Sequence, residues 1–394
     1  MTEIIIAGLG QTDVGEHWDI GLRELAYTAI EAALKDAGGL KPQAMYVGNM
    51  LAPNLSRQAH LGALLADFAG LRFDFAQHSA GIEAVTVEAA GASGGAALRQ
   101  GYLAVKSGLV DVALIVGVEK MTDQIGAGVE EALATAADSD YESVQGLTST
   151  AQAALLMKRY MYEYNVPANG FANFALTAHA NGVGNPHAMF RKAIKAETYA
   201  KAEMVCEPLN MFDAAPPADG AAALVLTRRE LLPSDWPQPL VRIAASANAS
   251  DTLALHDRRD PLFFEAAYLA TGRAIKQAGI TLDQIDFFEY HDSFSIYAAM
   301  SLESSGFAIR GQGWKMAADG RISLTSNLPC ATLGGLKARG FAGGATGVYQ
   351  AVEAATQLRV QAGACQVKEA RYGMIQSLGG PASTAVVHIL EKMD

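Results

Sequence analysis

Residues 88–97 of the chain read EAAGASGGAA. They follow a short run of strand-forming type at 84–87, and their small side chains let the backbone turn sharply and pack closely. Apolar residues then recur at helical spacing up to Gly108. The apolar run at 111–118 has the length of a strand and predicts a buried parallel strand. The whole stretch is therefore expected to form one βαβ unit: strand, glycine-rich turn, helix, strand.

The predicted turn is also the first candidate functional site. It places Gly91 at the N-terminus of a helix, where unpaired N–H groups and the helix dipole favour an anion or a developing oxyanion. The chemistry of the chain is therefore sought first around Gly91.

Length and composition limit the possible classes of protein. The chain has 394 residues, half of them hydrophobic, which is enough for a sizeable core. It has no uninterrupted apolar run of 18 residues, and its opening lacks the basic segment of a signal peptide, so we expect no membrane association. The net charge of −11 argues against nucleic acid as a partner.

Cysteine and histidine usage predicts neither a disulfide framework nor a metal site. The three cysteines are odd in number and widely spaced, which favours a reducing cytoplasm. The histidines, such as His60, His179 and His256, have no metal-ligand spacing. We therefore expect no metal and a cytoplasmic location.

The chain divides into three parts by its patterning. Strands and helices alternate up to 118, whereas 119–213 is rich in helical segments and aromatic residues and predicts an inserted, mostly helical lobe. The expected division is residues 1–118 with 214–235 as an N-terminal half, 119–213 as the lobe, and 236–394 as a C-terminal half. Within the first half, helices are expected at 22–37 and 58–68.

The C-terminal half repeats the N-terminal half. The helical stretch 26–38 aligns with 267–279, and the glycine turn at 91–96 has a counterpart at 340–347. Such a duplication is evidence for the fold in its own right. Two βαβ-rich halves can bring their two glycine turns together at a pseudo-twofold axis, where open α/β folds tend to bind ligands.

Several motifs together resemble the thiolase superfamily, in particular the archaeal-type and sterol-carrier-protein-type thiolases. Besides the first turn, the resemblance rests on GVEKMTD at 117–123, DGAAA at 219–223, HDSFS at 291–295, GGLKARG at 334–340 and QSLGG at 376–380. It covers nearly the whole chain. The resemblance implies an α/β thiolase fold with a duplicated core in five layers, α-β-α-β-α.

The resemblance also shows which catalytic groups are missing. In the family the position of Gly91 is a cysteine that takes the acyl group from an acyl-CoA, because a thiolate is nucleophilic at neutral pH. The position of Phe341 is a histidine that takes the thiol proton. A second histidine, matched by His291, helps to hold the thioester oxygen. Gly91 has no side chain and Phe341 has no proton acceptor, so an acyl-cysteine mechanism is disfavoured.

The groups that survive are mainly binding groups. The Gly91 N–H, the turn at Gly380 and His291 are expected to hold a thioester carbonyl or an enolate by hydrogen bonding. Ser293 and Phe294 follow His291 in its motif and are expected to contact substrate.

For the CoA phosphates, Arg191, Lys192 and Lys195 cluster at helical spacing in the lobe, which is the family's CoA-binding wall. An ordinary solvated helix face explains that cluster equally well.

Three other residues have competing interpretations. Ser93 is a candidate substitute nucleophile, but a small residue that packs the turn explains it better. Cys330 lies just before the GGLKARG motif and is a candidate rescued thiol, although an ordinary loop cysteine is the simpler reading. Tyr290 precedes His291 and, on a strand, should point to the opposite face.

Three functions remain open. The first is an acyl-CoA-binding thiolase homologue of the acyltransferase family, with a CoA thioester as ligand or substrate, no covalently bound cofactor and no ordinary thiolase turnover. The second is a non-catalytic scaffold subunit for a small OB-fold and zinc-ribbon protein or for a catalytic paralogue. The third is a CoA-thioester C–C lyase of retro-aldol type that uses His291. That branch of the family has tyrosines where this chain has His291 and Phe341, which weakens the third reading.

Family membership also predicts an oligomer. A homodimer or tetramer is expected, partly because the strand near Ile115 often pairs across a twofold axis in relatives.

Overall fold

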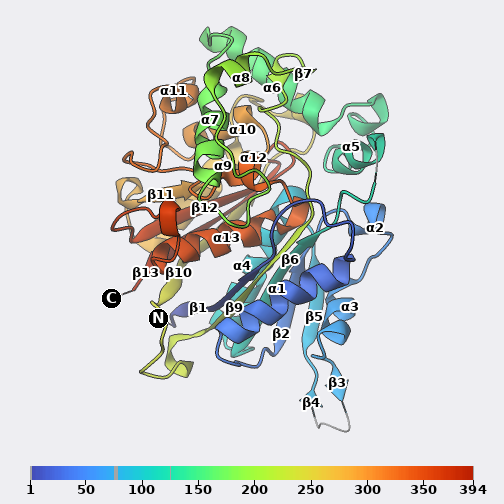
Figure 1. Ribbon diagram of the computed structural model, residues 1–394, viewed down its shortest axis with the longest axis vertical. Helices are drawn as coiled ribbons and strands as arrows, with labels where there is room; N and C mark the ends of the chain where they lie inside the picture. The colour runs from blue at the N-terminus through green and yellow to red at the C-terminus, as the bar shows by residue number, and fades with distance from the viewer. Residues whose placement is uncertain (1, 75–78, 125, 394) are drawn as a thin grey trace.

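The computed structural model of the chain describes residues 2–74, 79–124 and 126–393 and is an α/β structure built on one large mixed sheet (Figure 1). The strand order in this sheet is β11-β12-β13-β10-β1-β9-β6-β2-β5. Its strands are β1 (Ile4–Gln11), β2 (Ala44–Gly48), β5 (Glu83–Val87), β6 (Val112–Glu119), β9 (Gly220–Arg228), β10 (Val241–Ser250), β11 (Phe287–Glu289), β12 (Tyr372–Gly379) and β13 (Thr384–Lys392). Two small hairpins are formed by β3 (Phe73–Asp74) with β4 (Ser79–Ala80) and by β7 (Met204–Cys206) with β8 (Leu209–Asn210).

Helices cover the outer faces of the sheet and also lie between its two halves. They are α1 (Leu22–Asp36), α2 (Ala52–Leu55), α3 (Leu61–Phe68), α4 (Ser93–Ser107), α5 (Ala127–Ala134), α6 (Ser149–Tyr164), α7 (Ala172–Gly182), α8 (Ala196–Ala200), α9 (Glu265–Ala278), α10 (Ser295–Ser304), α11 (Gly313–Ala318), α12 (Gly335–Arg339) and α13 (Thr346–Leu358). Within the described residues, the 3-10 turns are η1 (Ala90–Ala92), η2 (Ser143–Gln145), η3 (Arg229–Leu231), η4 (Leu255–Asp257), η5 (Leu282–Gln284), η6 (Gly343–Ala345) and η7 (Gly363–Cys365).

The sheet consists of two halves that meet at a narrow join. Strands β1 and β10 share a single register pair, Ile5 with Arg242, whereas β1 pairs with β9 and β10 with β13 along most of their lengths. Side chains alternate between faces along each strand. Ile4 and Ile6 of β1 therefore enter the core between the halves, while Ile5 packs on the outer face beneath α1.

Three hydrophobic clusters define five layers. The central cluster packs α4 and α13 between the two half-sheets. An outer cluster places α1 and α3 on the N-terminal half-sheet. The other outer cluster places α9 and α10, with the lobe helices α6 and α7, on the C-terminal half-sheet. The chain thus has the five-layer α-β-α-β-α arrangement that the resemblance implies.

Glycines let the two central helices begin in backbone contact. A Cβ on Gly94 would lie 2.8 Å from the Gly344 carbonyl oxygen, and one on Gly347 would lie 2.2 Å from the Gly95 nitrogen. Any side chain at Gly94 or Gly347 would force the two helices apart. The two repeated glycine turns therefore face each other at the centre of the molecule, as the internal repeat predicts.

Several sequence-based boundaries need correction. The helix expected at 58–68 begins at Leu61, because His60 has a left-handed φ of 61° that a helix cannot include. Strand β10 was not among the predicted elements. The strand around Ile115, β6, cannot pair across a twofold axis as expected, because β2 and β9 occupy both of its edges.

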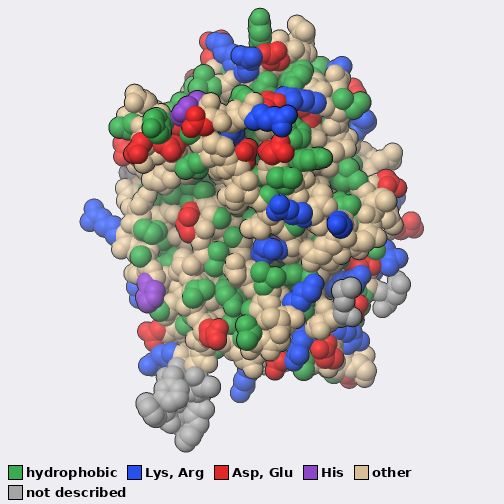
Figure 2. Space-filling model, turned by 180° about the vertical axis from the view of Figure 1, so that it is seen from behind, with side chains coloured by type: hydrophobic (Ala, Val, Ile, Leu, Met, Phe, Trp, Pro, Cys, Tyr) green, Lys and Arg blue, Asp and Glu red, His purple; other side chains and the backbone are tan. Residues whose placement is uncertain are grey.

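The inserted lobe lies at one end of the molecule, around α5 to α8 (Figure 1). The predicted helices at 150–164 and 171–181 are α6 and α7. On the face seen in Figure 2, basic and acidic side chains are interspersed, with no single basic field. Within the described ranges, no helix is long and apolar enough to cross a membrane.

Candidate functional site

A cavity of about 1150 Å³ opens between the lobe and the two half-sheets. Its walls are predominantly apolar, as is usual for a small-molecule site. Eight of the residues that the sequence singles out line this cavity: Gly91, Arg191, Lys192, His291, Ser293, Phe294, Phe341 and Gly380. The fold therefore collects residues that lie up to 289 positions apart (380 − 91) around one space.

Gly91, the nucleophile position that the resemblance predicts, is tightly enclosed. Gly91 lies in η1, directly before α4, and Ala90 before it has a left-handed φ of 50°. A Cβ on Gly91 would lie 2.7 Å from the Leu378 carbonyl oxygen and 3.2 Å from Cε1 of His291. The first of these distances is shorter than real Cβ contacts allow. The backbone of the neighbouring strand β12 therefore occupies space that a cysteine side chain would need.

His291 is held neutral in the wall of the cavity. It lies between β11 and α10 and is 2 % exposed. Burial, with a smaller contribution from the positive charge of Arg339, lowers the pKa of His291 to about 3. Its Nδ1 has no hydrogen-bond partner in the described part of the chain. A neutral imidazole of this kind can donate one hydrogen bond to a ligand oxygen and accept another.

Phe341, the position at which the resemblance predicts a missing base, lies next to His291. Its ring packs edge-on against His291, with the ring centroids 5.8 Å apart and an interplanar angle of 83°. It also belongs to a small apolar cluster with Leu51, Met121 and Leu336. Phe341 thus forms an apolar wall next to His291.

Two backbone amides remain free for a ligand. Gly91 N–H and Gly380 N–H both belong to cavity-lining residues, and no protein atom of the described chain accepts a hydrogen bond from either. The two turns abut, because a Cβ on Gly379 would lie 2.6 Å from the Ala89 carbonyl oxygen. Unpaired N–H groups in such turns can stabilise a thioester oxygen or an enolate.

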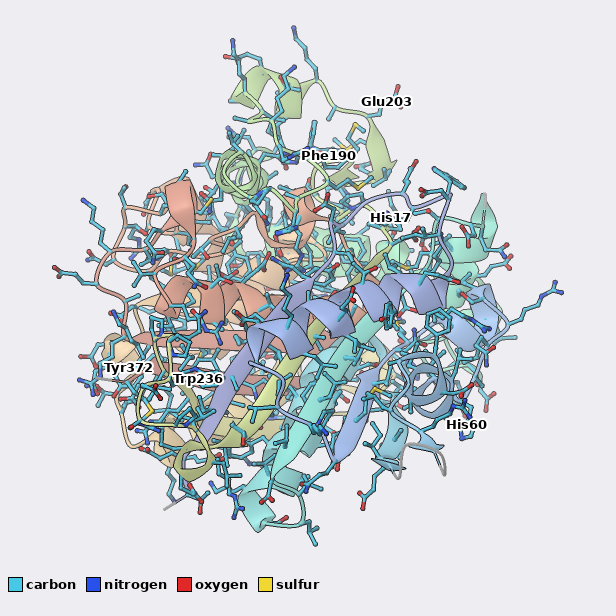
Figure 3. All side chains as sticks on the ribbon, turned by 60° about the horizontal axis from the view of Figure 1, so that its bottom comes forward. His17, His60, Phe190, Glu203, Trp236 and Tyr372 are labelled. Carbon is cyan, nitrogen blue, oxygen red and sulfur yellow. The ribbon has the colours of Figure 1, made fainter. Side chains whose placement is uncertain are left out.

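The cationic residues lie at the mouth of the cavity, in a loop. The expected helical spacing of Arg191, Lys192 and Lys195 is wrong, because this segment is irregular and α8 begins only at Ala196. All three side chains are exposed and line the cavity. Phe190 lies beside them in the lobe, well away from His60 at the periphery (Figure 3).

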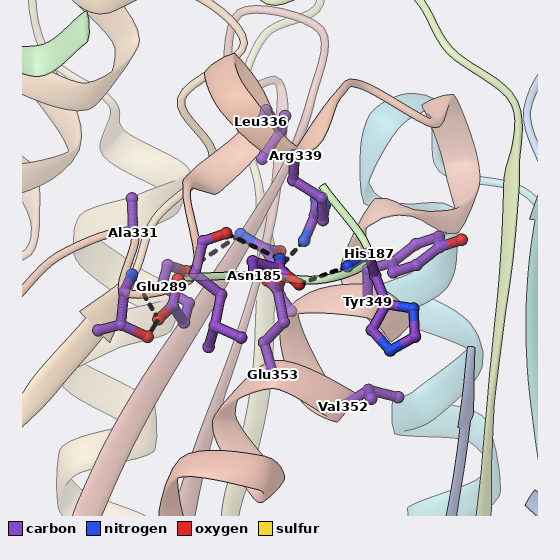
Figure 4. A network of polar contacts seen from close by, with 12 residues as sticks. Asn185, His187, Glu289, Ala331, Leu336, Arg339, Tyr349, Val352 and Glu353 are labelled. Atoms are coloured by element: carbon purple, nitrogen blue, oxygen red, sulfur yellow. Dashed lines mark hydrogen bonds and ion pairs between the residues drawn. The ribbon is translucent and has the colours of Figure 1, made fainter. Parts of the chain in front are cut away.

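A buried polar network includes Arg339, Glu353 and Glu289 (Figure 4). Arg339 donates to Glu353 at 2.6 Å and lies over the Tyr349 ring. Glu289, next but one before His291, accepts hydrogen bonds from Thr332. Burial raises the pKa of Glu353 to about 8 and also raises the pKa of Glu289. This network fixes the segment that carries His291.

A second buried carboxylate joins the two halves. Glu119 accepts hydrogen bonds from the backbone N–H groups of Met50, Leu51 and Gly344, and from the side chain of Asn49. Burial raises the pKa of Glu119 to about 7, although these hydrogen bonds act to lower it. The carboxylate therefore ties the loop after β2 to the glycine turn η6 of the other half.

The candidate substitute nucleophiles lie outside the cavity. Ser93 accepts from the Ala89 N–H at 2.9 Å and donates to the Ala90 carbonyl at 2.6 Å, so it packs the turn. Cys330 is fully buried beside Glu289, and burial raises the pKa of its thiol well above the usual value. Tyr290 points into the outer hydrophobic cluster, as predicted from strand alternation. None of these three side chains lines the cavity described above.

Sequence reasoning missed several polar residues of the cavity. Lys337 is buried, donates to the Asp213 carbonyl at 2.6 Å, and has its pKa lowered to about 8 by burial. It belongs to the GGLKARG motif, but the motif alone gives no role for it. His179, Gln152 and Tyr297 also line the cavity. They come from separate helices, so no local pattern could have linked them to the site.

The described residues contain no group of three His, Cys, Asp or Glu side chains that could hold a metal ion. The chemistry that this arrangement supports is recognition of a carbonyl oxygen by N–H donors beside a neutral imidazole. The cationic mouth suits an anionic ligand, and the apolar interior suits an acyl chain.

Comparisons with known proteins agree with this geometry. The model of the thiolase N-terminal domain matches residues 4–230, and the thiolase C-terminal domain-like model matches residues 247–392. The chain is 40 % identical to an acetyl-CoA acetyltransferase of Methanothermobacter thermautotrophicus over 394 residues, covering all of both chains.

The chain is also similar to two further proteins, one by sequence and one by structure. The chain is 29 % identical to benzoylsuccinyl-CoA thiolase subunit BbsB of Thauera aromatica, covering 96 % of this chain and 95 % of that one. Among solved structures, an Ltp2-ChsH2(DUF35) aldolase superposes with a TM-score of 0.81 at 22 % identity, covering 99 % of this chain and 98 % of that chain. At that level of identity, the superposition supports the fold alone.

Proposed function

The chain belongs to the thiolase family, and we propose that it is an acyl-CoA-binding member that does not carry out ordinary acyl-cysteine turnover. The observation that carries this proposal is the position of Gly91. It lies in the same cavity as His291 and the free Gly380 amide, yet the space for a cysteine side chain beside it is filled by the Leu378 carbonyl. Groups that bind a thioester carbonyl are retained while the nucleophile is absent.

The mouth of the cavity supports the CoA part of the proposal. Arg191, Lys192 and Lys195 offer three positive charges on an otherwise acidic chain. Phosphate groups attract such side chains by charge-assisted hydrogen bonds. The acyl group would then extend past Phe341 towards His291.

Calorimetric titration of the purified chain with CoA and acetyl-CoA tests the proposal. We expect micromolar binding of both and no thiolysis of acetoacetyl-CoA. No binding at millimolar ligand would rule out a CoA-thioester site in the isolated chain. Turnover at a rate typical of enzymes, with a median near 10 s⁻¹, would contradict the loss of covalent catalysis.

A scaffold role is the second candidate. One relative is described as a thiolase subunit, and one structural neighbour is described as a complex with a DUF35 protein. These descriptions favour a chain that works with a small OB-fold and zinc-ribbon partner. Co-purification with such a partner, together with CoA binding that appears only in the complex, would favour the scaffold over the first candidate.

A retro-aldol C–C lyase that uses His291 is the third candidate, and what favours it is a relative named a steroid side-chain-cleaving aldolase, to which the chain is 26 % identical over 363 residues. His291 is buried, neutral and next to Phe341, so the site offers one imidazole and no second proton-transfer group at the base position. Release of an aldehyde or ketone from a β-hydroxyacyl-CoA, abolished by His291→Asn, would support this reading.

We further propose a cytoplasmic homodimer or tetramer. Within the described residues, β5 pairs with β2 along one edge only, and Val85 on it is half exposed. An open edge of this kind offers backbone groups to a second copy. Sedimentation of the purified chain at several concentrations checks the oligomeric state.

A further inference from the structure

Three oxygen-bearing side chains on one side of the cavity have no role in the binding described above. Glu130 on α5 and Ser149 and Thr150 at the start of α6 all line the cavity, and all three residues are partly exposed. Helix α5 packs against α6, which holds the three side chains together. They form one polar area, the α5–α6 cluster, in a predominantly apolar wall.

Glu130 is a carboxylate without a cationic partner. Within the described residues, its only hydrogen-bond donor is the Thr150 hydroxyl, which lies 3.3 and 3.4 Å from the two carboxylate oxygens, and no Lys, Arg or His side chain pairs with it. Burial raises the pKa of the carboxyl group, which means that its surroundings disfavour the negative charge. A carboxylate withdrawn from water is normally paired with a positive charge. A ligand in the cavity can supply that charge.

The two hydroxyl groups of the α5–α6 cluster are left as acceptors. Thr150 donates to Glu130, and Ser149 donates to the Leu133 carbonyl oxygen at 3.2 Å. A hydroxyl has one proton to donate and two lone pairs that accept. With both protons in use, the cluster offers a ligand three acceptor side chains and no donor.

This pattern of acceptors selects the chemistry of the ligand group. A keto or carboxylate oxygen has no proton to give, so the α5–α6 cluster cannot hold it. An ammonium group has three N–H donors and a positive charge, and charge-assisted hydrogen bonds to a carboxylate are among the strong ones. It therefore matches the cluster both in hydrogen bonding and in sign.

The α5–α6 cluster lies on the side of the thioester-binding groups. Glu130 and Leu133 are three residues apart and so share one face of α5. Leu133 packs in the small apolar cluster that contains Phe341. The chain that follows α5 reaches the second glycine turn, because a Cβ on Gly380 would lie 3.2 Å from the Ala136 carbonyl oxygen. A group held by Glu130 would thus belong to the acyl part of a thioester.

We propose that the acyl group recognised here carries a protonated amine, which Glu130, Ser149 and Thr150 hold against the wall formed by α5 and α6. This inference rests on the proposed function, because it assumes that a CoA thioester occupies the cavity. It also predicts that an acyl group ending in a carboxylate is disfavoured, since it would meet the like charge of Glu130.

Isosteric pairs of acyl-CoAs test the inference by calorimetric titration. β-Alanyl-CoA differs from butyryl-CoA only by an ammonium group in place of a methyl group, and 6-aminohexanoyl-CoA differs from heptanoyl-CoA in the same way. We expect the amine to bind about tenfold more tightly in the pair whose chain length reaches Glu130. Adipoyl-CoA, which ends in a carboxylate, should bind more weakly than heptanoyl-CoA. CoA itself lacks the acyl group and is the reference for the proposed function.

Two variants locate the effect. Glu130→Gln keeps the shape of the side chain but removes its charge, and it should abolish the preference for the amine. Thr150→Val removes one of the acceptor oxygens and should reduce the preference. Glu131→Gln, at the exposed neighbouring position on α5, is the matched control and should retain it.

The outcomes separate the two proposals. Binding of CoA with equal affinities within both pairs would overturn this inference and leave the proposed function standing. An amine preference that survives in Glu130→Gln would also overturn it. Weaker binding of CoA itself by Glu130→Gln would assign Glu130 to the CoA part of the ligand and would overturn it as well. Failure of CoA to bind the original chain would instead reject the proposed function, and this inference with it.

Discussion

The carbonyl oxygen of Leu378 lies 2.7 Å from the point that a Cβ atom would take on Gly91. The end of β12 and the turn η1 are therefore closer together than they could be around a residue with a side chain. The backbone arrangement at this position thus fits glycine and excludes larger residues.

Replacing Gly91 by cysteine should destabilise the chain rather than restore an enzyme. The new Cβ must displace the Leu378 backbone, and overpacking of this kind costs about 1–3 kcal/mol. Urea unfolding of Gly91→Cys measures the loss. Gly15→Cys is the control, because a Cβ on Gly15 meets nothing within 4 Å, and it should stay within about 0.5 kcal/mol of the original chain.

The double variant Gly91→Cys with Phe341→His should also fail to cleave acetoacetyl-CoA. The two replacements supply the missing side chains but leave the backbone of β12 where it is. Recovery of thiolysis by this variant would show that the Leu378 carbonyl moves easily and that the site differs from an active one only by two side chains.

His291 should make the fold sensitive to acid. Its pKa is lowered to about 3 in the folded chain, against 6.5 for a free histidine, so below pH 6.5 the unfolded state binds more protons. The contribution of neutral His291 to the stability of the fold is complete above pH 6.5 and is lost as the pH falls towards 3. Between pH 6.5 and 5, this single group should cost about 2 kcal/mol of unfolding free energy.

The pH effect can be assigned by substitution. Between pH 7 and pH 5, the free energy of unfolding in urea should fall by about 2 kcal/mol less for His291→Asn than for the original chain. His256→Asn, at an exposed position, should leave the difference as it is. An equal acid dependence for His291→Asn and the original chain would mean that His291 is not the group responsible.

Lys192 should contribute to CoA affinity in a manner that depends on salt. Lys192→Gln removes one exposed charge at the mouth and should weaken CoA binding about fivefold to tenfold at low salt, or about 1–1.4 kcal/mol. The difference should shrink above 0.1 M salt, where the screening length is about 10 Å. Lys41→Gln, an exposed lysine before β2, is the control. An unchanged dissociation constant for Lys192→Gln would place the phosphates elsewhere.

Much of the fold could be predicted because its signals are local. The glycine turn at Gly91, the apolar strand β6 and the repeat of the two halves all follow from patterns within short stretches. The helix that begins at Leu61 was placed too early, because the left-handed conformation of His60 has no signal in composition. Strand β10 was missed for a different reason: its small residues, Ala245 and Ala247 among them, show little contrast between faces.

The site was predictable only where a motif marks it. His291, Phe341 and Gly380 are found through motif positions, and the cavity brings them together. Gln152 and Tyr297 line the same cavity from α6 and α10, and their distance in sequence hides the association. The closeness of Leu378 to Gly91 is a backbone relationship, which residue identities do not encode.

The Glu119 carboxylate has a consequence for the rate at which a ligand can enter and leave. It joins the loop after β2 to the turn η6, and the glycines of α4 and α13 hold the two halves of the chain in backbone contact at the same boundary. Because the halves are joined at this boundary, the site cannot open by their separation. Exchange of ligand should then pass the loop that carries Phe190, so we expect the residence time of a ligand to depend on the lobe.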